Sequence, residues 1–151
     1  MQSTNLSENQ FPPLLRKSWY SLNQAFRRRI AHLDITPNQY TILRWLFQSA
    51  PNGLSQKEIV KQMSSDANTI AAIMTRLEAK NLVSRCQDPK DKRAYQVSIT
   101  TTGKKVYKQA APIADNLQNE ILASITAKKQ KEFLKQLAEV ANACQDALAQ
   151  S

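Results

Sequence analysis

Apolar residues recur along most of the chain at steps of three and four, the spacing of one face of an α-helix. Three such stripes are long, and each predicts an amphipathic helix. The first is formed by Phe11, Leu15, Trp19, Leu22, Phe26, Ile30 and Leu33. The second is formed by Val106, Ala110, Ile113, Leu117, Ile121 and Ile125, and the third by Phe133, Leu134, Leu137, Val140, Ala141 and Leu148.

Shorter helices are expected between the first two stripes, because start signals recur there. Thr36 precedes a proline and stands three residues before Gln39, which predicts an N-cap and a capping box. Ser55 and Glu58 repeat the capping-box spacing. The segment 64–66, Ser-Ser-Asp, can cap a further helix that carries the apolar residues Ala67, Ile70, Met74 and Leu77. Two short helices so close together predict a helix-turn-helix.

The period changes from helix to strand after Asn81, a residue that tolerates the left-handed conformation of a helix C-terminus. Residues 82–87 read as one strand, and apolar residues alternate with polar ones over 95–99 as a second. The charged segment 88–93, DPKDKR, is then the tip of a β-hairpin that follows a helix-turn-helix. We therefore expect a mainly α fold with a small β-hairpin wing.

The helix expected from about residue 66 to 80 carries an unusual polar face. Its outward positions are small or hydrogen-bonding rather than rich in Glu and Lys. They are Asn68, Thr69, Ala72, Thr75 and Arg76. Small residues allow a helix to approach the floor of the DNA major groove, and Asn, Thr and Arg bond base edges or phosphates. The alternative is an ordinary solvated helix surface.

Charge supports a polyanionic partner, because 21 Lys and Arg residues against 12 Asp and Glu residues give a net charge of +9. A membrane surface would need a helix with an entirely basic polar face, and the charged faces here are mixed. At the hairpin tip, Lys90, Lys92 and Arg93 offer positive charge to phosphates or to a narrow minor groove. Asp88 can stabilise the turn, and Asp91 is placed to orient Arg93.

Other function classes find little support in the residues. One His, two Gly and no metal-ligand spacing leave no candidate for catalysis, so we expect a protein that is not an enzyme and needs no metal or cofactor. Cys86 and Cys144 are far apart and are interpreted as free thiols, with a redox switch as the alternative. No signal peptide or membrane span is evident, which favours the cytoplasm.

The chain resembles the MarR-type transcriptional regulators in three consecutive motifs. Leu77-Glu78 with residues 81–85, NLVSR, corresponds to L-E-x-x-G-L-V-x-R of that family. Residues 88–93 correspond to D-x-x-D-x-R, and Ile99-Thr100 followed by Gly103 corresponds to L-T-x-x-G. Asn81 replaces the usual Gly, a change that its tolerance of left-handed backbone explains.

The resemblance implies a homodimeric winged-helix protein that binds pseudo-palindromic operators and is released by a small ligand. It places residues 66–80 in the major groove, Arg93 in the minor groove with Asp91 bracing it, and the helix opened by Ser55 and Gln56 on phosphate. The expected DNA-contacting residues are Ser55, Gln56, Ser65, Asn68, Thr69, Ala72, Thr75, Arg76, Lys90, Asp91, Lys92 and Arg93.

Residues 1–151 would form a single domain with a winged-helix lobe over about 36–99. Helices over about 9–33 and 100–150 would dimerise, because their stripes are more apolar surface than one small lobe can cover. Trp19, Tyr20 and Tyr40 could line a pocket for an aromatic effector, although aromatic residues at helical spacing are more often core. The function expected is a ligand-responsive repressor. The alternatives are a protein-interaction scaffold and a non-specific DNA-binding protein.

Overall fold

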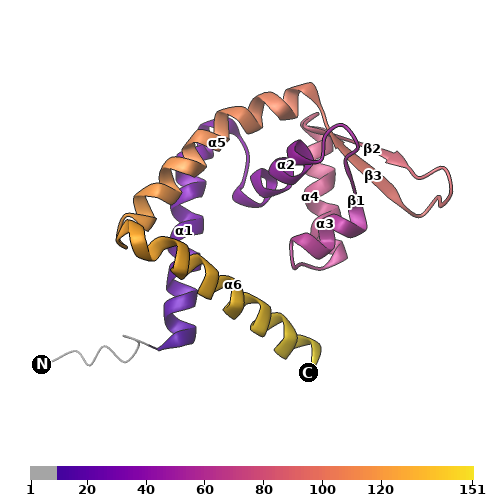
Figure 1. Cartoon of the computed structure of the whole chain (residues 1–151). Coiled ribbons are helices and arrows are strands. Elements are labelled where there is room, and N and C mark those ends of the chain that lie inside the picture. The colour runs from indigo at the N-terminus through magenta and orange to yellow at the C-terminus, as the bar shows by residue number, and fades with distance from the viewer. Residues whose placement is uncertain (1–9) are drawn as a thin grey trace, which may run out of the picture. The chain divides into compact units, whose positions relative to one another are not determined.

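The computed structural model describes residues 10–151 and divides the chain into two compact units, Met1–Ala114 and Asp115–Ser151 (Figure 1). Helices predominate. In chain order the elements are α1 (Phe11–Ile30), the 3-10 turn η1 (Ala31–Leu33), α2 (Pro37–Gln48), β1 (Leu54–Ser55), α3 (Gln56–Gln62), α4 (Ala67–Ala79), β2 (Val83–Gln87), β3 (Tyr95–Ile99), α5 (Thr101–Leu122) and α6 (Ala127–Ala149). The mainly helical fold with a β-hairpin wing is confirmed.

The core of the first unit lies where the apolar faces of α2, α3 and α4 meet the sheet. The side chains contributed there are almost all aliphatic and close to fully buried, so the hydrophobic effect is the main force that holds the lobe together. They include Ile30, Ile42, Leu43, Leu46, Ile59, Ile70, Met74, Leu77, Val83 and Val97. The last turn of α1 and the residue Ala110 of α5 close this core.

The sheet has three antiparallel strands in the order β1-β3-β2. In the hairpin, Val83 pairs with Ile99 and Arg85 pairs with Val97, so Val83 and Val97 turn inward to the helices. The third strand was not expected from the sequence, because β1 is two residues long and too short to show alternation. Gly53 before it has a φ of +73°, and a Cβ there would lie 2.1 Å from the Val97 carbonyl oxygen.

The helix starts agree with the capping signals in the sequence. Both capping boxes form, that of Thr36 and Gln39 and that of Ser55 and Glu58. Asp66 caps α4 by accepting a hydrogen bond of 2.9 Å from the Thr69 backbone N–H. These bonds satisfy N–H groups that a helix terminus otherwise leaves without partners.

Both helices of the helix-turn-helix end in the same way, with a non-glycine residue in left-handed backbone. Ser64 after α3 has a φ of 48°, and Asn81 after α4 has a φ of 56°. After α4, the Asn81 N–H bonds the Glu78 carbonyl and the Leu82 N–H bonds the Leu77 carbonyl, which is a Schellman motif. The left-handed Asn81 was expected, whereas Ser64 was not.

Several details of the expected helices were wrong. The first α-helix ends at Ile30 and not at Leu33, because the chain tightens into a 3-10 turn that Asp34 closes with a φ of 54°. Ala67 is exposed, since it stands in the first turn of α4, ahead of the buried part of the stripe. The helix α5 ends at Leu122, so Ile125 of the second stripe lies in the turn before α6 and not on the helix.

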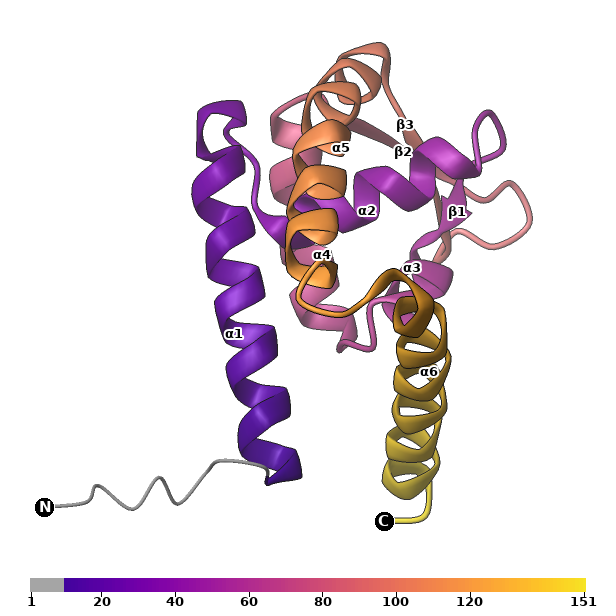
Figure 2. The ribbon, with the colours of Figure 1, turned by 60° about the vertical axis from the view of Figure 1, so that its left-hand side comes forward.

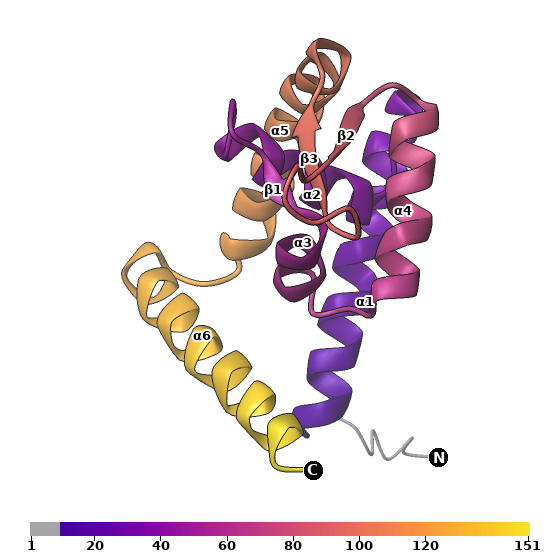
Figure 3. The ribbon, with the colours of Figure 1, turned by 90° about the vertical axis from the view of Figure 1, so that its right-hand side faces the viewer.

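The apolar stripe of α1 is only partly covered within its own unit. Figures 2 and 3 show the N-terminal half of α1 extending beyond α3 and α4. Accordingly Phe11, Leu15 and Trp19 are 42% to 65% exposed, whereas Ile30 at the other end is fully buried. A large apolar surface on one helix is therefore left without cover from the lobe.

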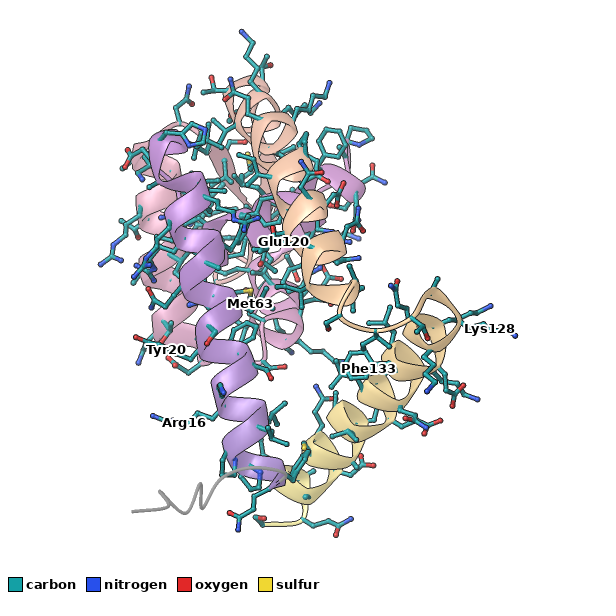
Figure 4. The ribbon with its side chains drawn as sticks, turned by 90° about the vertical axis from the view of Figure 1, so that its left-hand side faces the viewer. Arg16, Tyr20, Met63, Glu120, Lys128 and Phe133 are labelled. Atoms are coloured by element: carbon teal, nitrogen blue, oxygen red, sulfur yellow. The ribbon has the colours of Figure 1, made fainter. Side chains whose placement is uncertain are left out.

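The second unit shows the same pattern on α6. Phe133, Leu134 and Leu137 are 40% to 46% exposed. In Figure 4, Phe133 projects from one side of α6 and Lys128 from the other, so the helix is amphipathic. Gln130 secures the turn between α5 and α6 by donating to the carbonyls of Leu122 and Ile125, at 2.9 and 3.1 Å.

Candidate nucleic-acid interface

The loop between β2 and β3 protrudes from the lobe beyond the helices, as Figure 1 shows, and is shaped by two aspartates. The Asp88 carboxylate accepts a hydrogen bond from the Lys90 N–H at 2.8 Å, and the Asp91 carboxylate accepts one from the Arg93 N–H at 3.0 Å. Asp91 thus orients Arg93 through its backbone. Lys90, Lys92 and Arg93 are all exposed.

The outward face of α4 is available along its length. Asn68, Thr69, Ala72, Thr75 and Arg76 are all exposed, as the sequence predicted for a face that contacts a partner. Two of the hydroxyl groups donate within the helix. Thr69 donates to the Asp66 carboxylate at 2.6 Å, and Thr75 donates to the Ala71 carbonyl at 3.0 Å, so both keep their oxygen lone pairs for a hydrogen-bond donor.

The carboxyl group of Asp66, the N-cap residue of α4, has a shifted pKa. The Thr69 hydroxyl, followed by the Thr69 N–H, donates to the Asp66 carboxylate and lowers the pKa of Asp66 below its ordinary value. Ser65, half-buried beside this cap, stands at the turn that joins α3 to α4. The carboxylate is therefore charged at neutral pH, and its hydrogen bonds to Thr69 stabilise the first turn of α4.

The start of α3 offers fewer groups than the sequence suggested. The Ser55 N–H donates to the Glu58 carboxylate at 2.7 Å, and the Ser55 hydroxyl accepts from the Glu58 N–H at 3.1 Å. The N–H groups of Gln56 and Lys57 remain at the helix terminus without intrahelical acceptors. Of the expected phosphate contacts here, the Gln56 backbone is thus better placed than Ser55.

Arg85, which the sequence pattern did not indicate as a functional residue, contacts several other side chains. Its guanidinium pairs with both oxygens of the Glu78 carboxylate, donates to the Gln56 side chain at 3.4 Å and lies over the Tyr95 ring at 5.3 Å. Hydrogen bonds from Arg85, together with its charge, lower the pKa of Glu78. The signal was present in the spacing of Glu78 and Arg85, but spacing alone does not show that the two side chains meet.

The residues expected to line an effector pocket lie in different surroundings. Trp19 and Tyr20 are neighbours on α1, each 65% exposed. Tyr40 is buried in an aromatic cluster with Phe26 and Tyr107, whose ring centroids lie 5.0 and 5.8 Å from its own. Tyr40 therefore contributes to the core of the lobe.

Residues 10–151 offer little other site chemistry. Cys86 and Cys144 are exposed free thiols. In this range no three His, Cys, Asp or Glu side chains gather as metal ligands. None of the helices described is both long enough and apolar enough to cross a membrane. The exposed face of α4 and the basic loop remain the features with clear binding chemistry.

The chain is similar to known proteins over the helix-turn-helix and the hairpin and beyond them. The model of the MarR family matches residues 35–95, which span the helix-turn-helix and most of the hairpin. The transcriptional regulator HosA of Escherichia coli O111:H- is 30% identical over 135 residues, covering 86% of this chain and 98% of HosA. The likeness therefore extends over nearly the whole length of both proteins.

Solved structures agree at the level of fold. The MepR of S. aureus, in a crystal structure of its DNA complex, matches with a TM-score of 0.84 at 23% identity and covers 90% of this chain and 99% of that one. PcaV of Streptomyces coelicolor, a transcriptional regulator solved with its natural ligand, matches with a TM-score of 0.77 at 25% identity. It covers 95% of this chain and 99% of its own.

Proposed function

This chain belongs to the MarR family of transcriptional regulators, and on that premise we propose that it is a repressor that binds a pseudo-palindromic operator as a homodimer. The observation that carries the proposal is the exposed face of α4, small and hydrogen-bonding, beside a hairpin whose tip is basic. The α4 helix enters the major groove, and Arg93 of the loop reaches the adjacent minor groove. Repression follows when the dimer occupies a promoter.

The DNA-contacting residues proposed are those named from the sequence. Asn68, Thr69, Ala72, Thr75 and Arg76 read bases or phosphates from α4, together with Ser65 at its start. Lys90, Lys92 and Arg93 contact phosphates and the minor groove, with Asp91 bracing Arg93. Ser55 and Gln56 approach phosphate at the start of α3. All the members of this set on α4 and in the loop are exposed, which supports the proposal.

The dimer is proposed to form through the apolar faces of α1, α5 and α6. Phe11 and Leu15 on α1 and Leu134 and Leu137 on α6 are large apolar side chains with 40% or more of their surface exposed. Burying such side chains in a second copy removes them from water, which is the usual driving force of obligate dimers. Two α4 helices then stand about 34 to 36 Å apart, one turn of DNA.

A small-molecule effector is proposed to weaken operator binding by favouring a different separation of the two α4 helices. Trp19 and Tyr20 are accessible for an aromatic ligand, and Arg27, Arg28 and Arg29 on the same helix favour an anion. Benzoate serves as the probe, and Trp19→Ala should abolish any release of DNA that benzoate causes.

Since the relatives are transcriptional regulators and not enzymes, we propose a non-catalytic protein that works in the cytoplasm, where promoter DNA is found.

The proposal is tested by binding the purified protein to a fluorescent DNA fragment from upstream of its own gene. Random-sequence competitor is added at two salt concentrations, because phosphate contacts alone give affinity that falls steeply with salt. A preference for the upstream fragment that survives the competitor supports a sequence-specific regulator. Equal binding to both DNAs that collapses with salt would favour the non-specific alternative, and no binding would favour the scaffold.

A further inference from the structure

Arg85 on β2 contacts three other elements of the lobe at once. Its Nε lies 3.2 Å from Glu78 Oε2, and its Nη2 lies 3.2 Å from Glu78 Oε1. This is a two-pronged pair in which both N–H groups are directed at one carboxylate. The Arg85 side chain is 20% exposed and that of Glu78 is 43% exposed, so the pair is partly shielded from water and from salt.

The same guanidinium reaches two further elements. Its Nη1 donates to Gln56 Oε1 on α3 at 3.4 Å, and its central carbon Cζ lies over the Tyr95 ring of β3. One side chain therefore joins α3, α4 and both strands of the hairpin. The bond to Gln56 occupies the amide oxygen, which leaves the Gln56 NH₂ group free to donate elsewhere.

The position of Arg85 along the hairpin determines what this junction controls. Val83, Arg85 and Gln87 share one face of β2. Val83 packs in the core, whereas the Gln87 amide bonds the Lys92 carbonyl of the protruding loop itself. Within residues 10–151, Arg85 is the outermost residue on this face of β2 that bonds a helix. Beyond it the remaining support comes from the outer edge of β3, where Gln96 pairs with Ser55 of β1 and donates to the Asn52 carbonyl at 3.0 Å.

We propose that Arg85 is a positioning residue for operator recognition, which holds the hairpin at one angle to α4 so that Arg93 and α4 reach the same half-site. This inference rests on the proposed function, because it assumes that Arg93 and α4 contact DNA together. Without the junction the loop still carries its positive charges, but it samples more orientations before binding. The cost of ordering it then falls on the binding step and lowers affinity.

Glu78→Gln distinguishes positioning from charge. The substitution keeps the size of the side chain and removes one negative charge from a DNA-binding lobe, so a purely electrostatic effect would tighten operator binding. Positioning predicts the opposite sign, because an amide cannot hold the guanidinium with two charge-assisted bonds. We expect operator affinity to fall about two- to fivefold, the range of a partly exposed ion pair. Glu139→Gln on α6 is the matched control and should not weaken binding.

Arg85→Gln tests the coupling to the loop. In the wild-type background Arg93→Ala should weaken operator binding about fivefold or more. In the Arg85→Gln background, the fold-loss of operator affinity caused by Arg93→Ala should be at most about one third of the fold-loss in wild type. The reason is that the loop no longer presents Arg93 to the same half-site as α4. Circular dichroism and thermal unfolding of every variant check that the lobe is folded at the binding temperature.

The outcomes distinguish the positioning role of Arg85 from the proposed DNA contacts themselves. Weaker binding by folded Glu78→Gln, with a diminished Arg93→Ala effect in the Arg85→Gln background, supports the positioning role. Unchanged or tighter binding by Glu78→Gln, or an undiminished Arg93→Ala effect, overturns it and leaves the proposed function intact. If Arg93→Ala has no effect in the wild-type background, the proposed loop contact fails and the positioning role fails with it.

Discussion

Gly103 stands in the first turn of α5, where a side chain would meet the backbone of the preceding element. A Cβ there would lie 2.1 Å from the Leu82 carbonyl oxygen. The same junction is held by Thr100, whose N–H bonds the Leu82 carbonyl and whose hydroxyl bonds the Asn81 carbonyl and accepts from the Gly103 N–H. The Ile99-Thr100-x-x-Gly103 motif thus locks the start of α5 against the end of α4.

Gly103→Ala should therefore destabilise the protein, although Ala is the better helix former by about 1 kcal/mol. Overpacking against a backbone that cannot move aside typically costs about 1 to 3 kcal/mol, and here it should exceed the gain in propensity. The measurement is urea unfolding at one fixed protein concentration. Thr102→Ala, at an exposed neighbour, should stay within about 0.5 kcal/mol of wild type. An equally stable Gly103→Ala would show that the junction is looser than its geometry implies.

Asp66 links the charge of one residue to the stability of α4. Its pKa is lowered in the folded protein, chiefly by the Thr69 hydroxyl, so the ionised form stabilises the fold. This contribution is fully present above the ordinary pKa of 3.8 and is lost as the pH falls through the lowered value.

Asp66→Asn should remove this pH dependence. At about pH 5 the variant should be less stable than wild type, and the two should converge as the pH falls through the lowered pKa of Asp66. Thermal unfolding across that range at constant ionic strength measures the difference. A constant difference between the two proteins at all pH values would contradict the role given to the carboxylate.

At the scale of elements, the hairpin combines a rigid base with an exposed tip. Its base is fastened by Val83 and Val97 in the core and by Arg85 to α3 and α4. Its tip is closed by backbone bonds, including those from Asp88 to the Ala94 carbonyl and from Ala94 to the Asp91 carbonyl, at 2.9 and 3.0 Å. A basic side chain on such a loop can enter a groove without the chain around it having to fold first.

Arg93→Ala should weaken binding to the operator by about 1 to 3 kcal/mol. The loss should be smaller for random-sequence DNA, because the narrow minor groove that favours Arg depends on sequence. Fluorescence anisotropy with both DNAs gives the two affinities. Arg16→Ala removes the same charge from α1, where Figure 4 shows Arg16 projecting away from the lobe, and should leave both affinities nearly unchanged. An equal loss for the two substitutions would reduce the role of Arg93 to net charge.

At the scale of the whole molecule, the apolar faces of α1 and α6 leave large side chains exposed to water in a single chain. Leu134 and Leu137 are 46% and 40% exposed, and Phe11 is 55% exposed. In the proposed dimer these residues are covered, and the same contact determines the distance between the two α4 helices. Stability and operator spacing are then properties of the same interface.

Leu134→Glu should therefore dissociate the dimer and weaken operator binding together. Light scattering at micromolar concentration should give the mass of one chain, and affinity for a two-half-site operator should fall about 100-fold or more, because the second half-site no longer binds within the same molecule. Lys128→Glu, on the opposite side of α6, is the control that should stay dimeric. A monomeric wild-type protein at this concentration would contradict the homodimer outright.

Local features of the sequence were sufficient to predict much of the fold and of the candidate site. The capping signals at Thr36, Ser55 and Asp66 act within a few residues, so helix starts could be inferred from the chain alone. Asn81 and the charged loop 88–93 likewise follow from short-range backbone preferences and turn chemistry. The exposed face of α4 followed from helical periodicity, because side chains three and four residues apart share one face.

Only the tertiary structure decided the contacts between residues that are distant in sequence, because local backbone preferences do not determine them. The two-residue strand β1 exists because β3 offers it a free edge, and Tyr40 became core because Phe26 and Tyr107 pack on it. The contact of Arg85 with Gln56 spans 29 residues and depends on how the hairpin packs on the helices. The sequence by itself determined where helices start and which faces are apolar or basic, because those follow from neighbouring residues. Which faces meet is decided by packing, since the hydrophobic effect is non-directional and only the assembled chain selects the partners.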